Sequence, residues 1–196
     1  MKEYLTIFDA NHQKIGEKER RQVHLDGDWH ETFHCWFWKD RFVYLQRRST
    51  EKQDFPGKYD ITAAGHLATD ETVADGVREI EEELGLSLTF EQLTSLGIFE
   101  DVIELDGFLD REFAHLYSYA YQDEPLHFDD QEVMDVVAVQ RSELMALTEG
   151  RLRTIEGSSL MTNHHVQITQ ADLVPHRLAY WQHVFESLAR IDTLNR

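Results

Sequence analysis

The alternation of hydrophobic and polar residues predicts a chain rich in β-strands. Segments of aromatic and β-branched residues are separated by short polar stretches, as expected for half-buried strands. Lys39 and Asp40 lie between two such segments and are predicted to turn a hairpin. Strands are predicted at residues 4–9, 14–23, 32–38, 41–48, 61–65, 94–102, 113–121 and 133–140.

Three segments instead have helical periodicity: residues 73–84, 141–147 and a C-terminal helix at about 175–191. In the first, Val73, Val77, Ile80 and Leu84 fall on one side of a helix, and Gly85 follows directly, as is typical of helix ends. No pattern assigns residues 150–170. Several strands with a few helices predict an α+β fold or an α/β/α sandwich.

Length, composition and charge narrow the functional classes. A chain of 196 residues with 41% hydrophobic residues is expected to form a single domain, residues 1–196. A formal charge of −18 argues against a nucleic-acid partner, and a polyanionic substrate would need a metal ion to mask repulsion. Neither a membrane-spanning run nor a secretory signal is evident, so we expect a cytoplasmic protein, with a homodimer as the base-rate assembly.

Acidic residues are concentrated on the helix predicted at 73–84. Glu79, Glu82 and Glu83 gather on one side of it, and three like charges there repel one another. A hard cation such as Mg²⁺ or Mn²⁺ would bind such a group of oxygen ligands, and Arg78 could hold one carboxylate in place. The alternative from spacing alone is a solvated helix face in an acidic protein.

These residues resemble a known motif. Gly65, Arg78-Glu79-Ile80, Glu82-Glu83 and Gly85-Leu86 resemble the Nudix box of hydrolases that cleave a diphosphate linked to another group. The resemblance implies a Nudix fold, with a mixed sheet between helices, and structural roles for Gly65, Arg78 and Gly85. The spacing from Glu71 to Arg78 is one residue shorter than in the box, so either Asp70 or Glu71 could take the place of its loop glutamate.

Beyond the box, the chain resembles the branch that includes isopentenyl diphosphate isomerase. The resembling segments are VHLDGDWHETFHCW, LQRRSTEKQDFPGKYDITAAGH, DREFAHLY and DDQEVMD. The resemblance implies a second metal site, suited to Mn²⁺, Mg²⁺ or Zn²⁺, on His24, His30, His66, Asp110 and Glu112. Ala64 stands where the isomerases carry a cysteine, and this chain keeps an intact box, so both differences favour hydrolysis.

The implied reaction is attack of a metal-activated water on the phosphorus of a small nucleoside or isoprenoid diphosphate. The implied metal ligands are Glu79, Glu82, Glu83 and His66, and either Glu82 or Glu112 could be the general base. The resemblance places Arg47, Arg48 and Lys52 on the substrate phosphates, although solvated charges at a strand end are the alternative. An isomerase and a non-catalytic nucleotide-sensing module are the competing functions.

Several other residues have simpler interpretations. Cys35 lies in the aromatic run FHCWFW and is expected in the core, with a catalytic thiol as the alternative. Trp29, Trp36 and Trp38 alternate along a predicted strand, which favours core packing over stacking on a base. The pair His164-His165 suggests a metal ligand only by residue type.

Overall fold

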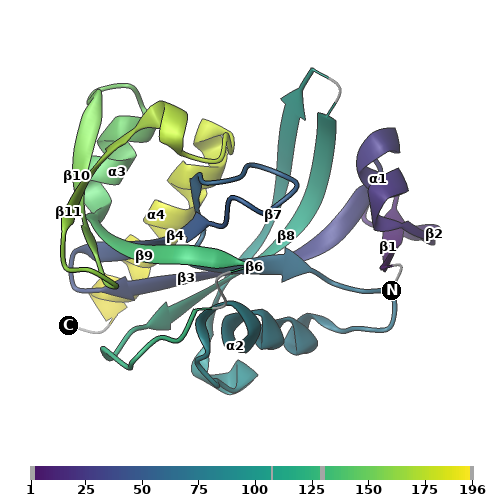
Figure 1. Ribbon diagram of the computed structural model, residues 1–196. Coiled ribbons are helices and arrows are strands. Elements are labelled where there is room, and N and C mark those ends of the chain that lie inside the picture. The colour runs from purple at the N-terminus through teal and green to yellow at the C-terminus, as the bar shows by residue number, and fades with distance from the viewer. Residues whose placement is uncertain (1–2, 107, 129–130, 195–196) are drawn as a thin grey trace.

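The computed structural model describes residues 3–106, 108–128 and 131–194 (Figure 1). Its strands are β1 (Tyr4–Phe8), β2 (Lys14–Glu19), β3 (Trp29–Lys39), β4 (Phe42–Arg48), β5 (Tyr59–Asp60), β6 (Ala63–His66), β7 (Thr94–Leu105), β8 (Phe108–Ala120), β9 (Val133–Gln140), β10 (Thr154–Ser159) and β11 (His165–Thr169). Its α-helices are α1 (Arg20–Asp26), α2 (Arg78–Leu84), α3 (Arg141–Thr148) and α4 (Leu178–Leu194), and its 3-10 turns are η1 (Val73–Val77), η2 (Phe90–Gln92) and η3 (Gln170–Asp172).

The strands form one mixed sheet built around β3. This strand pairs in parallel with β8 from Trp29 to Trp38 and antiparallel with β6, but it meets β4 only at two residue pairs beside their shared turn. From there, β4 continues with β5 on one side and β9 on the other. Strands β3 and β4 therefore separate after the hairpin, and the residues of β5 and β6 enter the gap.

Helices cover both faces of this sheet (Figure 1). On one face, Trp36 of β3 and Leu45 of β4 pack with α3 and α4. On the other face, Phe33 and Phe37 of β3 pack with Ile80 and Leu84 of α2. Successive strand residues point to opposite faces, so even-numbered residues of β3 face α4 and odd-numbered ones face α2. The α+β sandwich with a mixed sheet, predicted from sequence, is confirmed.

Most predicted elements are present, with three differences. The extended segment predicted at 14–23 ends at Glu19, because the polar run that follows forms α1, which Gly27 closes with a left-handed φ of 66°. The helix predicted at 73–84 begins as the 3-10 turn η1, and only Arg78–Leu84 is α-helical. Residues 150–170, which had no assignment, form the hairpin of β10 and β11. Asp129 and Asp130 of the DDQEVMD segment lie outside the described residues.

The core assignments of Cys35 and Trp36 are confirmed, whereas Trp29 is only partly buried and belongs to none of the core clusters of the described residues. Cys35 is fully buried among aromatic side chains on the α2 face, and burial raises the pKa of its thiol. Trp36 is fully buried against α4, while Trp38 is partly buried beside the same core. Trp29 stacks on Phe113. None of the helices in the described part of the chain is long and apolar enough to span a membrane.

Candidate active site

A cavity of about 610 Å³ opens where β3 and β4 separate. Thr32 and His34 of β3 line one side, and Arg48 and Asp60 line the other. The cavity also receives residues of α1, α2, the β7–β8 hairpin and the segment before α4. Of the residues singled out from sequence, it is lined by His24, Arg48, Lys52, Gly65, His66, Arg78, Glu79, Glu82, Glu83, Asp110 and Glu112.

Gly65 lets α2 approach β6 closely. A Cβ atom at this position would lie 2.0 Å from both Cδ and Oε1 of Glu79, so a larger residue would force that carboxylate to move. Burial, followed by the negative charge of Glu82, raises the pKa of Glu79 to about 7, against the opposing effect of Arg78. Helix α2 thus places the buried carboxylate of Glu79 in the cavity wall.

Glu83 is the second buried carboxylate of α2. Its Oε2 accepts hydrogen bonds from Gln46 Nε2 at 3.2 Å and from the Ala64 backbone N–H at 3.1 Å, and its Oε1 lies 4.0 Å from Lys52 Nζ. Burial and the neighbouring Glu79 raise the pKa of Glu83 to about 8. Burial and nearby like charge thus disfavour the ionised form of both acids, and a bound cation would stabilise that form.

Arg78 connects the loop before α2 with the acids on it. Its guanidinium bonds both oxygens of Glu71 and the His66 carbonyl, and its Nη1 donates to Glu79 Oε1 at 2.6 Å and Glu82 Oε2 at 2.9 Å. The structure thus places Glu71 against Arg78. Asp70 is exposed, so the shortened loop is closed by Glu71. Gly85 ends α2 with a left-handed φ of 65°.

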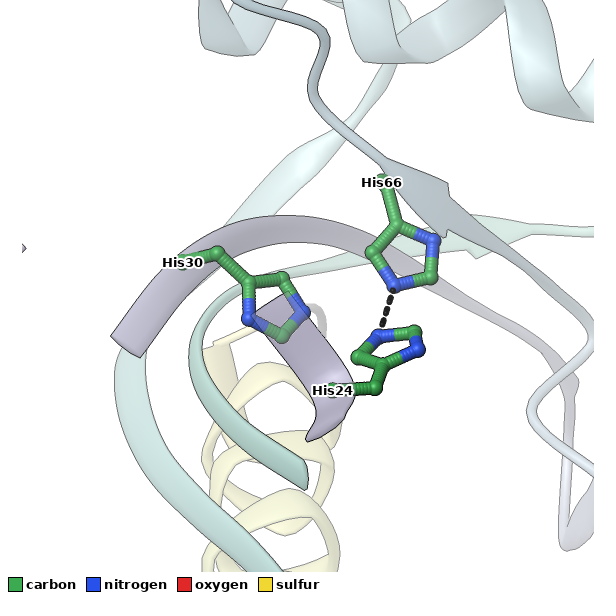
Figure 2. A group of neighbouring side chains, drawn as sticks. All are labelled: His24, His30 and His66. Carbon is green, nitrogen blue, oxygen red and sulfur yellow. Dashed lines mark hydrogen bonds between the residues drawn. The ribbon is translucent and has the colours of Figure 1, made fainter. Parts of the chain in front are cut away.

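Three histidines from separate elements lie close together (Figure 2). His24 comes from α1, His30 from β3 and His66 from β6, and their ring centroids lie 5.1–5.2 Å apart. The Nε2 atoms of His24 and His66 are 3.2 Å apart. Burial lowers the pKa of all three histidines, that of His24 to about 4, so all three are neutral at pH 7. Neutral imidazoles are the form that binds metal ions.

Two acids of β8 join this histidine group. Asp110 Oδ1 lies 3.4 Å from His30 Nε2 and 3.7 Å from His24 Nε2, and one ligand atom each from His30, Asp110 and Glu112 lie within 4.8 Å of one another. His30 Nε2 and Asp110 Oδ1 are buried without a hydrogen-bond partner among the described residues. A buried imidazole nitrogen and a buried carboxylate oxygen without hydrogen-bond partners are suitable ligand atoms for a cation. Of the ligand groups this close in the described chain, none contains Glu79, Glu82 or Glu83.

The three predicted phosphate-binding cations do not lie together. Arg48 and Lys52 line the cavity, where Arg48 donates to Asp60 Oδ2 at 3.2 Å and Lys52 contacts Glu132. Arg47 precedes Arg48 on β4, so its side chain takes the other face of the strand. Its Nε donates to the Gly57 carbonyl at 3.4 Å, and its guanidinium lies over the Tyr59 ring. Unlike Arg48 and Lys52, Arg47 is therefore not among the residues that line this cavity.

The C-terminal segment adds cavity residues that sequence analysis missed. His176 donates to Asp101 Oδ2 at 2.5 Å and to Asp60 Oδ1 at 3.0 Å. These two carboxylates outweigh burial and raise its pKa to about 10. Tyr180 of α4 bonds His34 Nδ1 at 2.9 Å, and His34 Nε2 lies 3.4 Å from Glu112 Oε2. Alternation along β3 could have placed His34 beside His30, but no sequence signal linked residues 176–180 to the site.

Comparison with known proteins shows the family of this chain. The family model of the NUDIX domain matches residues 28–157. The chain belongs to the Nudix family. A Nudix hydrolase of Clostridium acetobutylicum is 32% identical over 95% of this chain and 97% of its own. The protein is therefore a hydrolase that acts on phosphorus-containing anhydrides.

Other relatives mark the extent of the similarity. The isopentenyl-diphosphate Δ-isomerase of Serratia proteamaculans is 28% identical over 64% of this chain and 70% of its own. A solved structure from Deinococcus radiodurans superposes with a TM-score of 0.60 at 17% identity, covering 76% of this chain and 90% of that one. A MutT protein from Methanosarcina mazei gives 0.54 at 16% identity, covering 86% and 96%. Both structures share the fold of this Nudix protein.

Proposed function

We propose that this Nudix protein cleaves the diphosphate of a small nucleoside or isoprenoid compound by attack of water on phosphorus, with Mg²⁺ or Mn²⁺ bound. The observation that carries the proposal is the meeting of Glu79, Glu82 and Glu83 with Arg48 and Lys52 around one cavity. Carboxylates on one wall can hold cations, and cationic side chains can bind phosphate oxygens.

The donor atoms of the cavity fit divalent cations. Glu79, Glu82 and Glu83 would hold Mg²⁺ or Mn²⁺. Burial raises the pKa of Glu79 and Glu83, and a cation would favour their ionised form. His24, His30, His66, Asp110 and Glu112 would hold a second ion, for which their mixed nitrogen and oxygen set suits Mn²⁺ or Zn²⁺. A bound divalent ion lowers the pKa of water and offsets charge on phosphate oxygens.

The protein's own residues then position the substrate and move the proton. Asp60 and the Asp54 carbonyl hold the Arg48 guanidinium in the cavity, where it can meet a phosphate. The Glu82 side chain is 58% exposed, so water can reach its carboxylate. Glu112 is already engaged by His34 and belongs to the tight group with His30. We therefore assign proton acceptance to Glu82 and a ligand role to Glu112.

Replacement of Glu82 tests this assignment. Glu82→Gln keeps the shape of the side chain but removes the charge that both a metal ligand and a proton acceptor need, so we expect kcat to fall at least about 100-fold. The matched control is Glu81→Gln, which makes the same change one residue earlier, where the carboxylate accepts a hydrogen bond from Ser87 outside the cavity. Equal activity of the Glu82→Gln and Glu81→Gln enzymes would reject the role of Glu82.

A substrate panel tests the reaction itself. Nucleoside diphosphate sugars, dinucleotides, coenzyme A and isoprenoid diphosphates would be incubated with the protein and Mg²⁺ or Mn²⁺ in ¹⁸O-labelled water. Label in a phosphate product is expected, because water attacks phosphorus. Label in the organic alcohol would show attack on carbon and refute the mechanism. Tight metal-dependent binding without any turnover would instead support the nucleotide-sensing module.

The isomerase alternative needs a thiol or a substitute for one. Ala64 occupies the position of the isomerase cysteine, and the pairing of His34 with Ala64 places that position on the cavity face. Cys35 points from β3 to the opposite face and is fully buried. We therefore expect no deuterium to enter isopentenyl diphosphate in deuterated water. Incorporation of deuterium would favour the isomerase over the hydrolase.

A further inference from the structure

A second cluster of histidine and carboxylate groups lies outside the cavity. His12 in the β1–β2 turn and His115 of β8 both direct Nε2 at the same oxygen of Glu31 on β3. The Nε2 to Oε1 distances are 2.8 Å from His12 and 2.9 Å from His115. One ligand atom from each residue lies within 4.8 Å of the others. Three segments distant in sequence thus contribute two imidazoles and one carboxylate to one point.

This cluster is on the opposite face of the sheet from the cavity histidines. Glu31 follows His30 directly on β3, so the two side chains point to opposite faces. Strand β8 runs parallel to β3 and pairs Phe33 with His115, which places His115 on the same face as Glu31. Neither Glu31 nor His115 lines the cavity. An ion bound here would therefore be separate from any ion in the active site.

The ligand atoms are held in place before any ion binds. His12 has a left-handed φ of 59°, which is uncommon for a residue other than glycine. Its N–H donates to the Asp9 carbonyl at 3.0 Å, and its ring stacks on Phe113 with centroids 3.9 Å apart. The turn and the stacking direct its imidazole toward Glu31, so little conformational freedom remains to be lost on binding.

The carboxylate of Glu31 also lacks a permanently charged partner among the described residues. Among the described residues, Glu31 makes ion-pair contacts with His12 and His115 but with no lysine or arginine. The side chains of His12, Glu31 and His115 are 30%, 24% and 10% exposed, so an ion from solvent can reach them. Two imidazoles and a carboxylate form a ligand set typical of Zn²⁺ with a fourth position open to water.

We propose that His12, Glu31 and His115 form a Zn²⁺ site that fastens the β1–β2 hairpin to the sheet. That hairpin pairs with β3 through a single residue pair, Phe8 with Trp29. It leads directly into α1, which carries His24 into the cavity. Zn²⁺ bound on the face of the sheet opposite the cavity would hold this hairpin in place. It would thereby also hold α1, which presents His24 to the cavity. The proposal does not depend on which diphosphate the enzyme cleaves.

The number of Zn²⁺ ions bound per protein, measured in two double variants, tests the proposal. The full-length protein, stripped with EDTA, would be dialysed against Zn²⁺ beside His12→Gln/His115→Gln and His24→Gln/His66→Gln. Glutamine can still donate a hydrogen bond to Glu31, so the first variant removes the imidazole ligands while keeping a donor at each position. Melting temperature without metal checks that each variant folds.

We expect His12→Gln/His115→Gln to bind one Zn²⁺ fewer than the unaltered protein, also in the background that lacks His24 and His66. Chelator competition should show a loss of affinity at this site greater than about 10-fold. In the unaltered protein, Zn²⁺ should shift the ring ¹⁵N resonances of His12 and His115 and slow amide exchange in β1 and β2. Unchanged stoichiometry and ring resonances would overturn the site, whatever the hydrolase assays show. If a variant does not fold, the response of the His12 and His115 ring resonances to Zn²⁺ in the unaltered protein is the deciding test.

Discussion

The contact between Gly65 and Glu79 can be broken by adding a single methyl group. In Gly65→Ala, the new Cβ would lie 2.0 Å from Glu79 Cδ, and ordinary contact begins at 3.4 Å. The carboxylate must therefore move by more than about 1 Å from its present position, in which it accepts a hydrogen bond from Arg78 Nη1. A misplacement of that size costs about 100-fold in rate. Stability should change little, because the displaced atoms are the far end of a flexible side chain.

The assay is kcat/KM on the best diphosphate from the panel, with thermal unfolding measured in parallel. We expect Gly65→Ala to lose about 100-fold in kcat/KM. Gly16→Ala is the matched control, because a Cβ there would meet Ile7 at an ordinary 3.7 Å. Adding Glu79→Asp to Gly65→Ala should restore part of the rate, since the shorter side chain frees the space. If Gly65→Ala keeps the rate of the unaltered enzyme, the close approach does not position Glu79 for catalysis.

Two further predictions concern charged groups around the cavity. Arg48→Ala should raise KM at least about 10-fold because it removes a phosphate partner, whereas Arg47→Ala should leave KM unchanged; equal effects in steady-state kinetics would contradict the assignment. His176→Gln should cost about 3 kcal/mol of unfolding free energy at pH 7, because it breaks a buried ion pair. The pKa of His176 rises from 6.5 to about 10 on folding, so its contribution is complete below pH 6.5 and disappears as pH passes 10. Urea unfolding should show the gap between the two proteins narrowing over that range, and a constant gap would contradict the charged state.

Local patterns predicted the elements that build the box. The helical stripe of Ile80 and Leu84, the three acids and the terminal Gly85 are all encoded within one short segment. The hydrophobic period and the residue spacing are sufficient for prediction there, because helix geometry fixes which residues of a short segment share a face. The same is true of the β3–β4 hairpin, where Cys35 was correctly placed in the core.

Contacts between distant segments could not be predicted in this way. His176 reaches Asp60 and Asp101 only because the chain returns to the cavity before α4, and neither its spacing nor its neighbours indicate that path. The resemblance grouped Arg47 with Arg48, but the alternation of β4 sends the two guanidinium groups to different faces. The hairpin of β10 and β11 is stabilised by pairing with β9, which is a tertiary contact.

The two faces of β3 also determine how this protein can tolerate change. Thr32 and His34 face the cavity, while Glu31 and Phe33 face the opposite side. Substitutions on one face can therefore accumulate with little effect on the other. A deletion or insertion of one residue within β3 would exchange the two sets, moving catalytic-face histidines into the hydrophobic core and phenylalanines into the cavity. Across natural variants of this chain, we therefore expect single-residue length changes in β3 to be far rarer than substitutions.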